Sequence, residues 1–493
     1  MNAHRPWLIA TVPGRSPEQC RAEVEAAKLQ GADIAEIRLD LWPDEERRRL
    51  AALFPAPLPL IATYRSRAEG GAGSDDASQR AVILGELVRF PFWAIDREGA
   101  RDPPTAAGRG SPSVLSSHLP EGTDWPELRA RLLAADAAAR FVKVVLPASL
   151  AAGLTLLDQL GSIGPPPGVV LHTTGPSGAL FRVMGRTLGL AAVYCALGAS
   201  ASAPPVEPSQ IPVPWLHRYL AHTPTAPVYA LLGGSVGRSP SPALFASWFE
   251  EFDDPGIYIG LDVSTEGELA EALTRLPGRG FRGFNVTQPW KRAAYELADT
   301  LGPGSEACGA ANVLTVSPGG AIEAANTDLA AMLRRFRELV SQGDWDGGEL
   351  LVAGSGGSAR SCLAAGRASG ARIRLIARDH ARAAGLASEF GAELAESVAP
   401  GPAGLVLNAT SIGRPEAGPA GVNLAPYLGS GTILLDLVYA AQAPVLRQMA
   451  MARGAVYEDG FRLLVYQAAA AYELWMGHPV PEARIRARLA GPP

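Results

Sequence analysis

Residues 1–200 repeat one short unit, and this repetition limits the possible fold more than any other feature of the chain. Short apolar runs follow one another, and helix-like stretches such as residues 16–31 and 124–140 separate most of them. Strands that alternate with helices predict parallel βα units, and eight units in about 200 residues match a small (β/α)8 barrel, although an open doubly wound sheet would give a similar alternation. The eight runs are residues 7–12, 33–40, 59–65, 92–98, 113–118, 141–147, 168–175 and 191–198.

The rest of the chain predicts further α/β structure. A length of 493 residues is too great for one ordinary core, so we expect two or three domains. Residues 199–227 are rich in Pro, Ala and Ser, which indicates a last barrel loop, a short helix and a linker. Strands and helices alternate over residues 228–330, residues 348–379 have the order strand, glycine turn, helix and strand, and residues 461–477 have a helical pattern.

Composition argues against several classes of protein. The net charge is −5 and we find no basic patch or helix-turn-helix segment, so we expect no nucleic-acid or membrane partner. The four cysteines, Cys20, Cys195, Cys308 and Cys362, include no CxxC pair, which argues against a zinc site or a disulfide framework and suits a reducing cytosol. No run is long and apolar enough to cross a bilayer, and the N-terminus lacks the apolar core of a signal peptide, so we expect a cytoplasmic protein.

Lysine is rare in this chain. Lys28, Lys143 and Lys291 are its three lysines, and nearly every other basic residue is arginine. Lys143 lies in the apolar segment "RFVKVVLP", where the alternation of a strand puts Phe141, Lys143 and Val145 on one face. A lysine that is kept where arginine is the usual cation indicates chemistry that requires an amine.

Polar residues gather at the C-terminal ends of the predicted barrel strands, where (β/α)8 barrels carry their chemistry. Singly, each has a plain structural explanation: an exposed lysine on an edge strand, a structural histidine, or arginines in surface ion pairs. All of them converge on one rim under the same fold prediction, and this convergence weakens the structural explanation. The residues are Glu36, Arg38, Asp40, Arg65, Glu69, His118 and Lys143.

These residue types predict a class of reaction. A lysine in an apolar site lined by arginines is shifted toward its neutral amine, which can attack a ketone and form a Schiff base. A histidine can then remove a proton next to the imine carbon. Several arginines indicate an anionic substrate, in particular a carboxylate that is held bidentately.

The segments "DIAEIRLD", "TYRSRAEGG", "SSH" and "FVKV" resemble the type I 3-dehydroquinate dehydratase family, and the resemblance covers about residues 5–222. It implies that Lys143 forms an imine with the substrate ketone, that His118 takes the adjacent proton and later protonates the leaving hydroxyl, and that Glu69 orients His118. It also implies that five residues bind the cyclic polyol carboxylate: Glu36, Arg38, Arg65, Arg182 and Gln210.

Two positions depart from this family's pattern. Phe181 precedes Arg182 where the family usually has serine, and Val206 stands where the closing loop usually has another serine. Gln210 is kept, but Val206 supplies no hydroxyl to the closing loop. We therefore expect reduced affinity or rate at this site.

The segment "VAGSGGSA" has Gly354, Gly356 and Ala359 in GxGxxA spacing after an apolar strand. Such glycines let the backbone approach a pyrophosphate at a helix N-terminus, although an ordinary strand–helix turn can share the spacing. About 20 residues later, the segment "IARD" carries both Arg378, which favours the 2′-phosphate of NADP, and Asp379, which favours the ribose hydroxyls of NAD.

The segments "GRSPSPALF", "NVTQPWK", "GAANVLT", "ANTD", "GSGGSA", "NATSIG", "LLDLVY" and "DGFRLLVYQAA" resemble the shikimate dehydrogenase family over about residues 228–480. From spacing alone Lys291 and Asp328 could be a plain ion pair; the resemblance implies that Lys291 assists proton transfer at the oxygen where hydride leaves or arrives, and that Asp328 positions Lys291. The implied substrate ligands are Ser239, Ser241, Thr287, Asn312, Tyr439 and Gln467. The implied cofactor-binding residues are Gly354, Gly356, Gly357, Ser358, Ala359, Arg378, Asn408, Thr410, Ser411 and Gly460.

This half also departs from its family. Pro240 replaces the usual lysine of Ser-Lys-Ser-Pro, and Leu244 and Phe245 replace a histidine–asparagine pair. Arg378 keeps the partner for a 2′-phosphate, while Asp379 would repel it. We predict NADP as the cofactor and no metal.

Together the two resemblances predict a bifunctional dehydratase–dehydrogenase of the shikimate pathway, with 3-dehydroquinate, 3-dehydroshikimate and shikimate as its small-molecule substrates. The predicted fold is an N-terminal (β/α)8 barrel, residues 1–224, followed by a two-domain dehydrogenase. Its substrate-binding domain is residues 225–330 with C-terminal helices from 441–493, and its Rossmann-type domain is residues 331–440. The alternative is an NAD-linked quinate or shikimate dehydrogenase with a non-catalytic barrel as sensor or scaffold. The sequence leaves monomer and dimer open.

Overall fold

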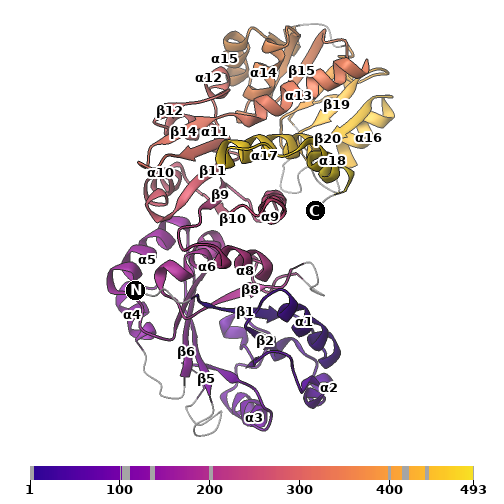
Figure 1. Ribbon diagram of the computed structural model, residues 1–493. Coiled ribbons are helices and arrows are strands. Elements are labelled where there is room, and N and C mark those ends of the chain that lie inside the picture. The colour runs from indigo at the N-terminus through magenta and orange to yellow at the C-terminus, as the bar shows by residue number, and fades with distance from the viewer. Residues whose placement is uncertain are drawn as a thin grey trace. The chain divides into compact units, whose positions relative to one another are not determined.

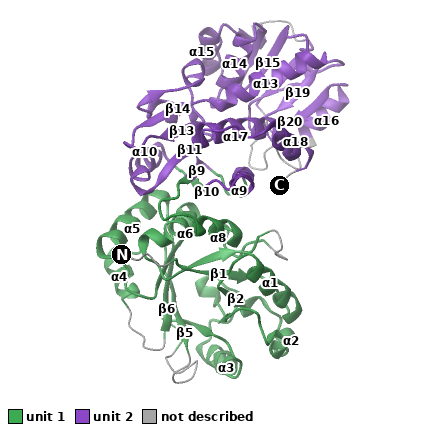
Figure 2. Cartoon of the chain, in the orientation of Figure 1, with its two compact units in different colours: residues 1–228, 235–238, 255–264 green, residues 229–234, 239–254, 265–493 purple. Residues whose placement is uncertain are grey.

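The computed structural model describes residues 5–99, 101–102, 112–133, 139–198, 204–397, 401–412, 421–438 and 444–491. The chain forms two compact units (Figure 2). The first comprises residues 1–228, 235–238 and 255–264, and the second comprises residues 229–234, 239–254 and 265–493. In the described part of the chain, no helix is both long enough and apolar enough to cross a membrane.

The first unit contains an eight-stranded parallel barrel, which confirms the prediction from the repeated runs (Figure 1). The strand order is β7-β6-β5-β4-β3-β2-β1-β8, so the first strand pairs with the last, which excludes an open doubly wound sheet. Strands β7 and β8 stand at the two ends of this order, and we call the line between them the seam. Each predicted run coincides with one strand, and β6 begins two residues before its run. The strands are β1 (Trp7–Val12), β2 (Ile34–Arg38), β3 (Leu60–Thr63), β4 (Ala94–Glu98), β5 (Ser113–His118), β6 (Ala139–Pro147), β7 (Val169–Thr174) and β8 (Ala192–Ala196).

Helices return the chain between these strands. Several start at a serine or aspartate whose side chain accepts a backbone N–H of the first turn, which satisfies a donor that the helix itself leaves unpaired. These helices and their caps are α1 (Pro17–Leu29) with Ser16, α3 (Ala77–Leu87) with Asp76, α4 (Trp125–Leu132) with Asp124, and α5 (Leu150–Ile163) with Ser149. Helices α6 (Gly178–Val183) and α8 (Val213–Ala221) follow later in the unit.

The barrel interior is built in layers, because residues two apart on a strand face the same side. The lower layer is apolar and buried: Ile9, Ile34, Ile61, Ala94, Val114, Phe141, Val170 and Ala192. Two residues further along each strand comes a second layer, which is mostly polar: Thr11, Glu36, Thr63, Asp96, Ser116, Lys143, His172 and Tyr194. An apolar floor therefore carries a ring of polar groups toward the C-terminal ends of the strands.

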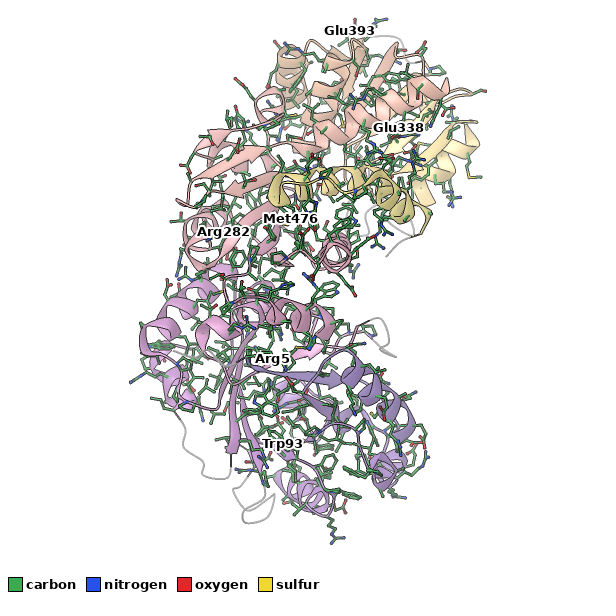
Figure 3. The ribbon with its side chains drawn as sticks, viewed as in Figure 1. Arg5, Trp93, Arg282, Glu338, Glu393 and Met476 are labelled. Carbon is green, nitrogen blue, oxygen red and sulfur yellow. The ribbon has the colours of Figure 1, made fainter. Side chains whose placement is uncertain are left out.

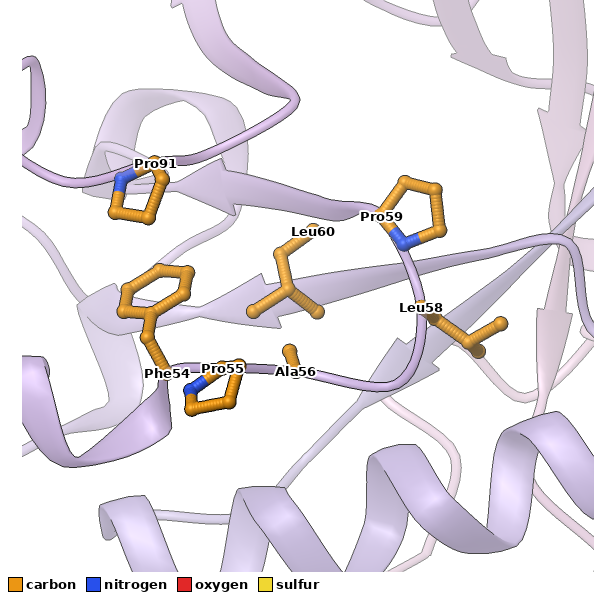
Figure 4. A pocket seen from close by; sticks show the side chains of 7 residues that line it. All are labelled: Phe54, Pro55, Ala56, Leu58, Pro59, Leu60 and Pro91. Atoms are coloured by element: carbon orange, nitrogen blue, oxygen red, sulfur yellow. The ribbon is translucent and has the colours of Figure 1, made fainter.

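Aromatic and proline residues cover the N-terminal end of the barrel. Trp93, which is labelled in Figure 3, belongs to this end of the barrel. Its ring centroid lies 5.7 Å from that of Phe141 and 6.3 Å from that of Trp7. A hollow of about 490 Å³ lies before β3 and β4 (Figure 4), and its lining is apolar throughout: Phe54, Pro55, Ala56, Leu58, Pro59, Leu60 and Pro91. These lining residues supply no acid, base or nucleophile, so this hollow is not suited to catalysis.

Residues 228–325 contribute a six-stranded mixed sheet with the order β10-β9-β11-β13-β14-β12. Strand β13 pairs antiparallel with both of its neighbours, and β12 pairs parallel with β14. The strands are β9 (Val228–Gly233), β10 (Ile257–Asp262), β11 (Phe281–Val286), β12 (Thr300–Leu301), β13 (Val313–Val316) and β14 (Ile322–Ala325). Helices α9 (Ser241–Phe252), α10 (Glu266–Arg275) and α11 (Lys291–Glu296) lie between them in sequence.

The second unit also holds a parallel sheet with the order β17-β16-β15-β18-β19-β20. In chain order this is 3-2-1-4-5-6, the strand order of a Rossmann fold, and it confirms the predicted nucleotide-binding architecture. The strands are β15 (Glu349–Ala353), β16 (Arg372–Ile376), β17 (Glu393–Leu394), β18 (Leu405–Asn408), β19 (Ile433–Asp436) and β20 (Val456–Asp459). Because β20 pairs with β19, this sheet extends past residue 440, and the predicted boundary there must move beyond Asp459.

Six long helices accompany this sheet and the C-terminus: α13 (Thr327–Gln342), α14 (Gly357–Ala368), α15 (His380–Phe390), α16 (Pro444–Ala452), α17 (Phe461–Met476) and α18 (Glu482–Ala490). Helix α17 coincides with the predicted helical segment 461–477. It packs on α9 through aromatic contacts, with Tyr472 5.6 Å from Trp248 and 6.2 Å from Phe245 between ring centroids. Helix α17 therefore returns to the mixed sheet after the chain has left the Rossmann sheet.

Candidate active sites

A cavity of about 500 Å³ lies at the C-terminal ends of the barrel strands. The polar second layer of the barrel and the loops after the strands line it. All eight residues that the sequence predicts for this site line the cavity together: Glu36, Arg38, Arg65, Glu69, His118, Lys143, Arg182 and Gln210.

Lys143 is buried at the bottom of the cavity, in the polar second layer of the barrel. Its Nζ lies 3.6 Å from Glu36 Oε1, and the two side chains are only 8% and 4% exposed. Glu36 also accepts hydrogen bonds from the hydroxyls of Thr63 and Thr11 at 2.9 and 3.1 Å. Burial lowers the pKa of Lys143 below its usual value, against Glu36 and Asp96, which raise it. A larger fraction of Lys143 is therefore a neutral amine than of an exposed lysine.

Glu36 itself stays ionised. Burial would raise the pKa of its carboxyl group, but Lys143, followed by Arg38 and Arg65, outweighs burial and lowers the pKa to about 2. The Glu36 carboxylate places a fixed negative charge next to the Lys143 amine. This charge can stabilise a cationic nitrogen.

His118 is hydrogen-bonded to Glu69 at the rim of the cavity. Its Nδ1 lies 2.8 Å from Glu69 Oε2, and Glu69 Oε2 also accepts from Arg65 Nη1 at 2.8 Å. Burial, followed by the charges of Arg65 and Lys143, lowers the pKa of His118 well below its usual 6.5. A neutral imidazole with Nδ1–H on Glu69 leaves Nε2 as the proton acceptor, so the geometry suits a general base.

The arginines of the cavity differ in what neutralises them. Arg38 pairs with Asp40 through Nε and Nη2, at 2.9 and 2.8 Å. Arg65 is held by Asp96 at 2.8 Å in addition to Glu69. Both pairings are made by the barrel itself, so these arginines are fixed in place before any ligand arrives.

Arg182 is paired with a loop residue. It donates from Nη2 to Glu207 Oε2 at 3.2 Å, and from Nη1 to Ser209 Oγ at 3.0 Å and the Gly178 carbonyl at 2.6 Å. Residues 206–210, which we call the lid, also place Gln210 Nε2 3.0 Å from Thr11 Oγ1. Val206 of the lid lines the cavity with an apolar side chain, so at that position the lid supplies no hydroxyl.

Lys291 begins α11 in the second unit and meets two other elements. Its Nζ donates to Asp328 Oδ2 at 2.6 Å and to Ser358 Oγ at 3.1 Å. Asp328 lies in the first turn of α13, and Ser358 lies in the first turn of α14. The amine is therefore held between the mixed sheet and the glycine turn of the Rossmann sheet.

Asn312 extends this cluster. Its Nδ2 lies 3.1 Å from Asp328 Oδ1 and 3.2 Å from Gln467 Oε1, and its Oδ1 accepts the Thr327 N–H at 2.7 Å. Four predicted residues are therefore joined by hydrogen bonds: Lys291, Asp328, Asn312 and Gln467. The other predicted substrate ligands have local bonds: Ser241 N–H donates to Ser239 Oγ at 3.2 Å, and Thr287 N–H donates to the Leu232 carbonyl at 2.9 Å. Tyr439 lies outside the described residues.

The glycine turn approaches its surroundings closely at two positions. Gly354 has φ +121°, and a Cβ there would lie 2.7 Å from the Ala409 carbonyl oxygen. A Cβ on Gly357 would lie 2.7 Å from Lys291 Cβ, so this glycine makes room for the lysine stem. Gly356 precedes α14 without a side chain to cap it, and Ala359 is fully buried within the helix. The first-turn N–H groups of α14 therefore suit an anionic ligand.

The other predicted cofactor residues divide into exposed and structural ones. Arg378 is exposed, whereas Asp379 caps α15 by accepting the Arg382 N–H at 3.0 Å. Asn408 is fully buried and bonded to Asp436 at 2.7 Å and to the Thr410 hydroxyl at 2.6 Å, while Ser411 is exposed. Gly460 is buried, and a Cβ there would lie 2.7 Å from the Leu437 carbonyl oxygen. Asn408 and Gly460 therefore shape the backbone of this region.

Family models match both halves of the chain. The model described as type I 3-dehydroquinase matches residues 8–223, the shikimate dehydrogenase substrate binding domain matches residues 231–314, and the shikimate 5'-dehydrogenase C-terminal domain matches residues 460–490. Shikimate dehydrogenase (NADP(+)) of Sphingopyxis alaskensis is 33% identical over 269 residues, which are 54% of this chain and 96% of that protein. The chain belongs to the shikimate dehydrogenase family, and its residues 8–223 match the type I 3-dehydroquinase model.

Other relatives resemble the dehydrogenase or the whole chain. Shikimate dehydrogenase (NADP(+)) of Methylobacterium radiotolerans is 38% identical over 53% of this chain and 97% of its own length. The solved structure of dehydroquinate dehydratase and shikimate dehydrogenase from S. pombe is 20% identical, with a TM-score of 0.43, and covers 99% of this chain and 98% of that one. The Thermus thermophilus shikimate 5-dehydrogenase in complex with NADP(H) and shikimate is 30% identical over 54% of this chain and 99% of its own, with a TM-score of 0.46.

The sequence analysis did not single out several polar residues of the barrel cavity, among them Thr11, His172, Tyr194 and Glu207. His172 and Tyr194 lie inside apolar runs and belong to the polar layer that contains Lys143. His172 and Tyr194 follow Val170 and Ala192 of the apolar layer by two residues, so they face the same side of their strands. This spacing could have identified them once the inward face of each strand was known. In the described residues no group of three or more His, Cys, Asp or Glu could hold a metal ion.

Proposed function

We propose that the dehydroquinase half converts 3-dehydroquinate to 3-dehydroshikimate through an imine on Lys143, and that the dehydrogenase half reduces this product to shikimate with NADPH. The observation that carries the first step is the burial of Lys143, next to ionised Glu36, in the cavity that also holds the His118–Glu69 pair. An amine, a neutral imidazole and a fixed carboxylate are the groups that imine-assisted dehydration requires.

Imine formation begins at the neutral amine of Lys143. The nitrogen lone pair attacks the ketone carbon, the carbonyl π electrons move to oxygen, and that oxygen takes up a proton. The nitrogen gives up one proton, the new hydroxyl takes up a second proton and leaves as water, and the nitrogen lone pair closes a C=N bond whose nitrogen keeps one N–H and a positive charge. Arginine cannot replace lysine here, because its guanidinium stays protonated and is not a nucleophile at ordinary pH.

The cationic imine then acidifies the neighbouring carbon. Nε2 of His118 takes a proton from that carbon, and the electron pair flows to the imine nitrogen to form an enamine. The enamine expels the hydroxyl group on the next carbon, which His118 protonates as it leaves as water. Hydrolysis of the remaining imine releases the unsaturated ketone and restores Lys143. Glu69 holds His118 with Nε2 toward the cavity throughout.

Arg182 is the best candidate for the substrate carboxylate. Arg38 and Arg65 are paired with acids of the barrel, whereas the ion-pair partner of Arg182 is Glu207 of the lid. A substrate carboxylate can take the place of the Glu207 carboxylate on the guanidinium without breaking a pairing within the barrel.

In the dehydrogenase, Lys291 is placed to donate a proton to the oxygen that gains hydride. Asp328 fixes its ammonium group, and Asn312 fixes Asp328 from the other side. The glycine turn fits a dinucleotide, because Gly354 and Gly356 keep side chains away from the uncapped start of α14. When bound, NADPH supplies the hydride, and Arg378 supplies an exposed cation for its 2′-phosphate.

The alternative of a non-catalytic barrel is weakened by the cavity. A scaffold would not need a buried lysine, an ionised partner and an oriented imidazole together. A coupled assay tests the proposal: supply 3-dehydroquinate and NADPH and follow NADPH absorbance. Steady consumption supports both steps. If NADPH is consumed only after 3-dehydroshikimate is added, the dehydratase assignment fails. If NADPH is still not consumed but NADH is, the cofactor assignment is wrong.

A further inference from the structure

Tyr194 places its ring directly against the reacting nitrogen of Lys143. The distance from Lys143 Nζ to the ring centroid is 3.8 Å, which is a cation–π contact. Tyr194 is 3% exposed and Lys143 is 7% exposed, so little water competes for this contact. Such contacts are strongest when both partners are desolvated.

The seam of the barrel holds Tyr194 in this position. In a regular ladder a neighbouring strand would satisfy its backbone groups, but here two side chains do so. The N–H of Tyr194 donates to His172 Nε2 at 3.1 Å, and its carbonyl accepts from Arg182 Nε at 3.1 Å. Because Nε2 of His172 is an acceptor, the ring proton is on Nδ1 and the imidazole is neutral. Burial, with Arg182 and Lys143 nearby, also lowers the pKa of His172 well below its usual value.

We propose that Tyr194 is a further catalytic residue of the dehydratase, whose ring face stabilises the positive nitrogen of Lys143 as ammonium and as imine, and that His172 and Arg182 are positioning residues for it. The proposal rests on the imine mechanism proposed above. It adds a residue that acts on the reacting nitrogen itself.

The change in hydrogen bonding during the reaction explains why a ring is useful beside a carboxylate. The ammonium of Lys143 has three N–H groups, whereas the protonated imine has one. The imine can therefore donate fewer hydrogen bonds than the ammonium can. The ring face attracts positive charge without needing an N–H, so its contribution persists when the nitrogen becomes an imine.

Other charges also act on Lys143, and the test must separate the ring from them. Glu36 and Asp96 raise the pKa of the amine, whereas burial, Arg65 and Arg38 lower it. The titratable and charged groups around it are Glu36 and Arg38 of β2, Arg65 after β3, Asp96 of β4, His118 of β5 and His172 of β7. A change confined to the π electrons of Tyr194 leaves all of these groups in place.

The ring makes two opposite contributions to the rate of imine formation. It favours the ammonium over the neutral amine, so weakening it lowers the pKa of Lys143 and supplies more nucleophile at a given pH. It also favours the cationic imine, so weakening it reduces imine formation once the amine is neutral. A lower plateau together with a midpoint at lower pH is therefore the signature of the ring face.

The experiment replaces Tyr194 with phenylalanine and then with phenylalanines that carry successively more ring fluorines, which withdraw electron density from the face with little change in shape. Each protein is mixed with 3-dehydroquinate and borohydride, and the reduced adduct on Lys143 is measured by mass spectrometry across pH. Tyr194→Phe keeps the ring face and is the reference with which the fluorinated variants are compared. The most fluorinated variant should show a plateau lower by about tenfold to thirtyfold, the size of a desolvated cation–π contact.

The controls separate three outcomes. The same fluorinated series at Tyr219, a buried tyrosine of α8 in the same unit, should leave the profile unchanged. In a second outcome the wild-type protein forms the adduct on Lys143, while fluorination at position 194 changes neither its plateau nor its midpoint. That result would overturn the role of Tyr194 and leave the imine mechanism intact. Absence of any wild-type adduct would overturn the imine mechanism, and the Tyr194 proposal with it.

Discussion

Glu207→Gln should improve substrate binding by the dehydratase. Glu207 Oε2 lies 3.2 Å from Arg182 Nη2, the position that we propose for the substrate carboxylate. Glutamine keeps an oxygen that can accept the Ser209 N–H, now accepted by Glu207 at 3.1 Å, so the local structure of the lid is retained. The substitution removes the negative charge that competes with the substrate.

The magnitude follows from the geometry of the pair. Two unit charges about 3 Å apart attract by about 5 kcal/mol at an effective dielectric of about 20. Glu207 is 21% exposed and its carboxylate regains water when it is displaced, so most of this attraction is offset and a net competition of about 1–2 kcal/mol remains. The KM for 3-dehydroquinate should therefore fall by about tenfold, with kcat changed by less than about threefold.

Steady-state dehydration kinetics measured by the absorbance of the conjugated product test this prediction. Glu86→Gln is the matched control, because it removes the same charge from an exposed position on α3 and should leave KM unchanged. An unchanged or higher KM in Glu207→Gln would show that Glu207 organises the lid and does not compete for Arg182.

Four further predictions concern the two sites. Lys143→Arg should abolish dehydration and leave reduction of 3-dehydroshikimate intact, because arginine cannot form the imine; residual turnover would contradict the imine. The pKa of His118 is lowered, so the imidazole stays neutral at pH 6.5 and dehydration should decline only as pH falls through a value below 6.5, which a pH profile of kcat/KM checks. Lys291→Ala should slow reduction by about 10²–10⁴-fold while dehydration continues, and equal loss of both activities would refute separate sites. Asp379→Asn keeps the cap of α15 but removes a charge near Arg378, so the KM for NADPH should fall about twofold to fivefold while that for NADH does not.

The sequence predicted the barrel well because each of its strands has a local sequence pattern. Each strand is a short apolar run between helices, and β1 and β5 begin and end at the residues the sequence indicated. The alternation in β6 also placed Phe141 and Lys143 correctly on one face, the first in the floor and the second in the cavity. The local sequence pattern was sufficient to predict the position of a strand and the face that each of its side chains occupies.

Prediction was weaker where distant segments meet. The ion pair of Glu207 with Arg182 and the bond from Tyr194 to His172 depend on how the lid and the seam close, which no local pattern encodes. The boundary near residue 440 was placed too early because β20, "VYED", is a short edge strand with an exposed valine and no apolar run. The full burial of Asn408 becomes visible only in the packed sheet.

The scarcity of lysine also makes the chain unusually simple to read by proteolysis. A protease that cuts after lysine divides it at Lys28, Lys143 and Lys291 into four peptides. A substrate carbon reduced onto Lys143 blocks the middle cut and joins residues 29–143 to 144–291 in one fragment. Occupancy of the imine can therefore be followed as the transfer of material between bands on a gel, with residues 292–493 as an internal loading standard.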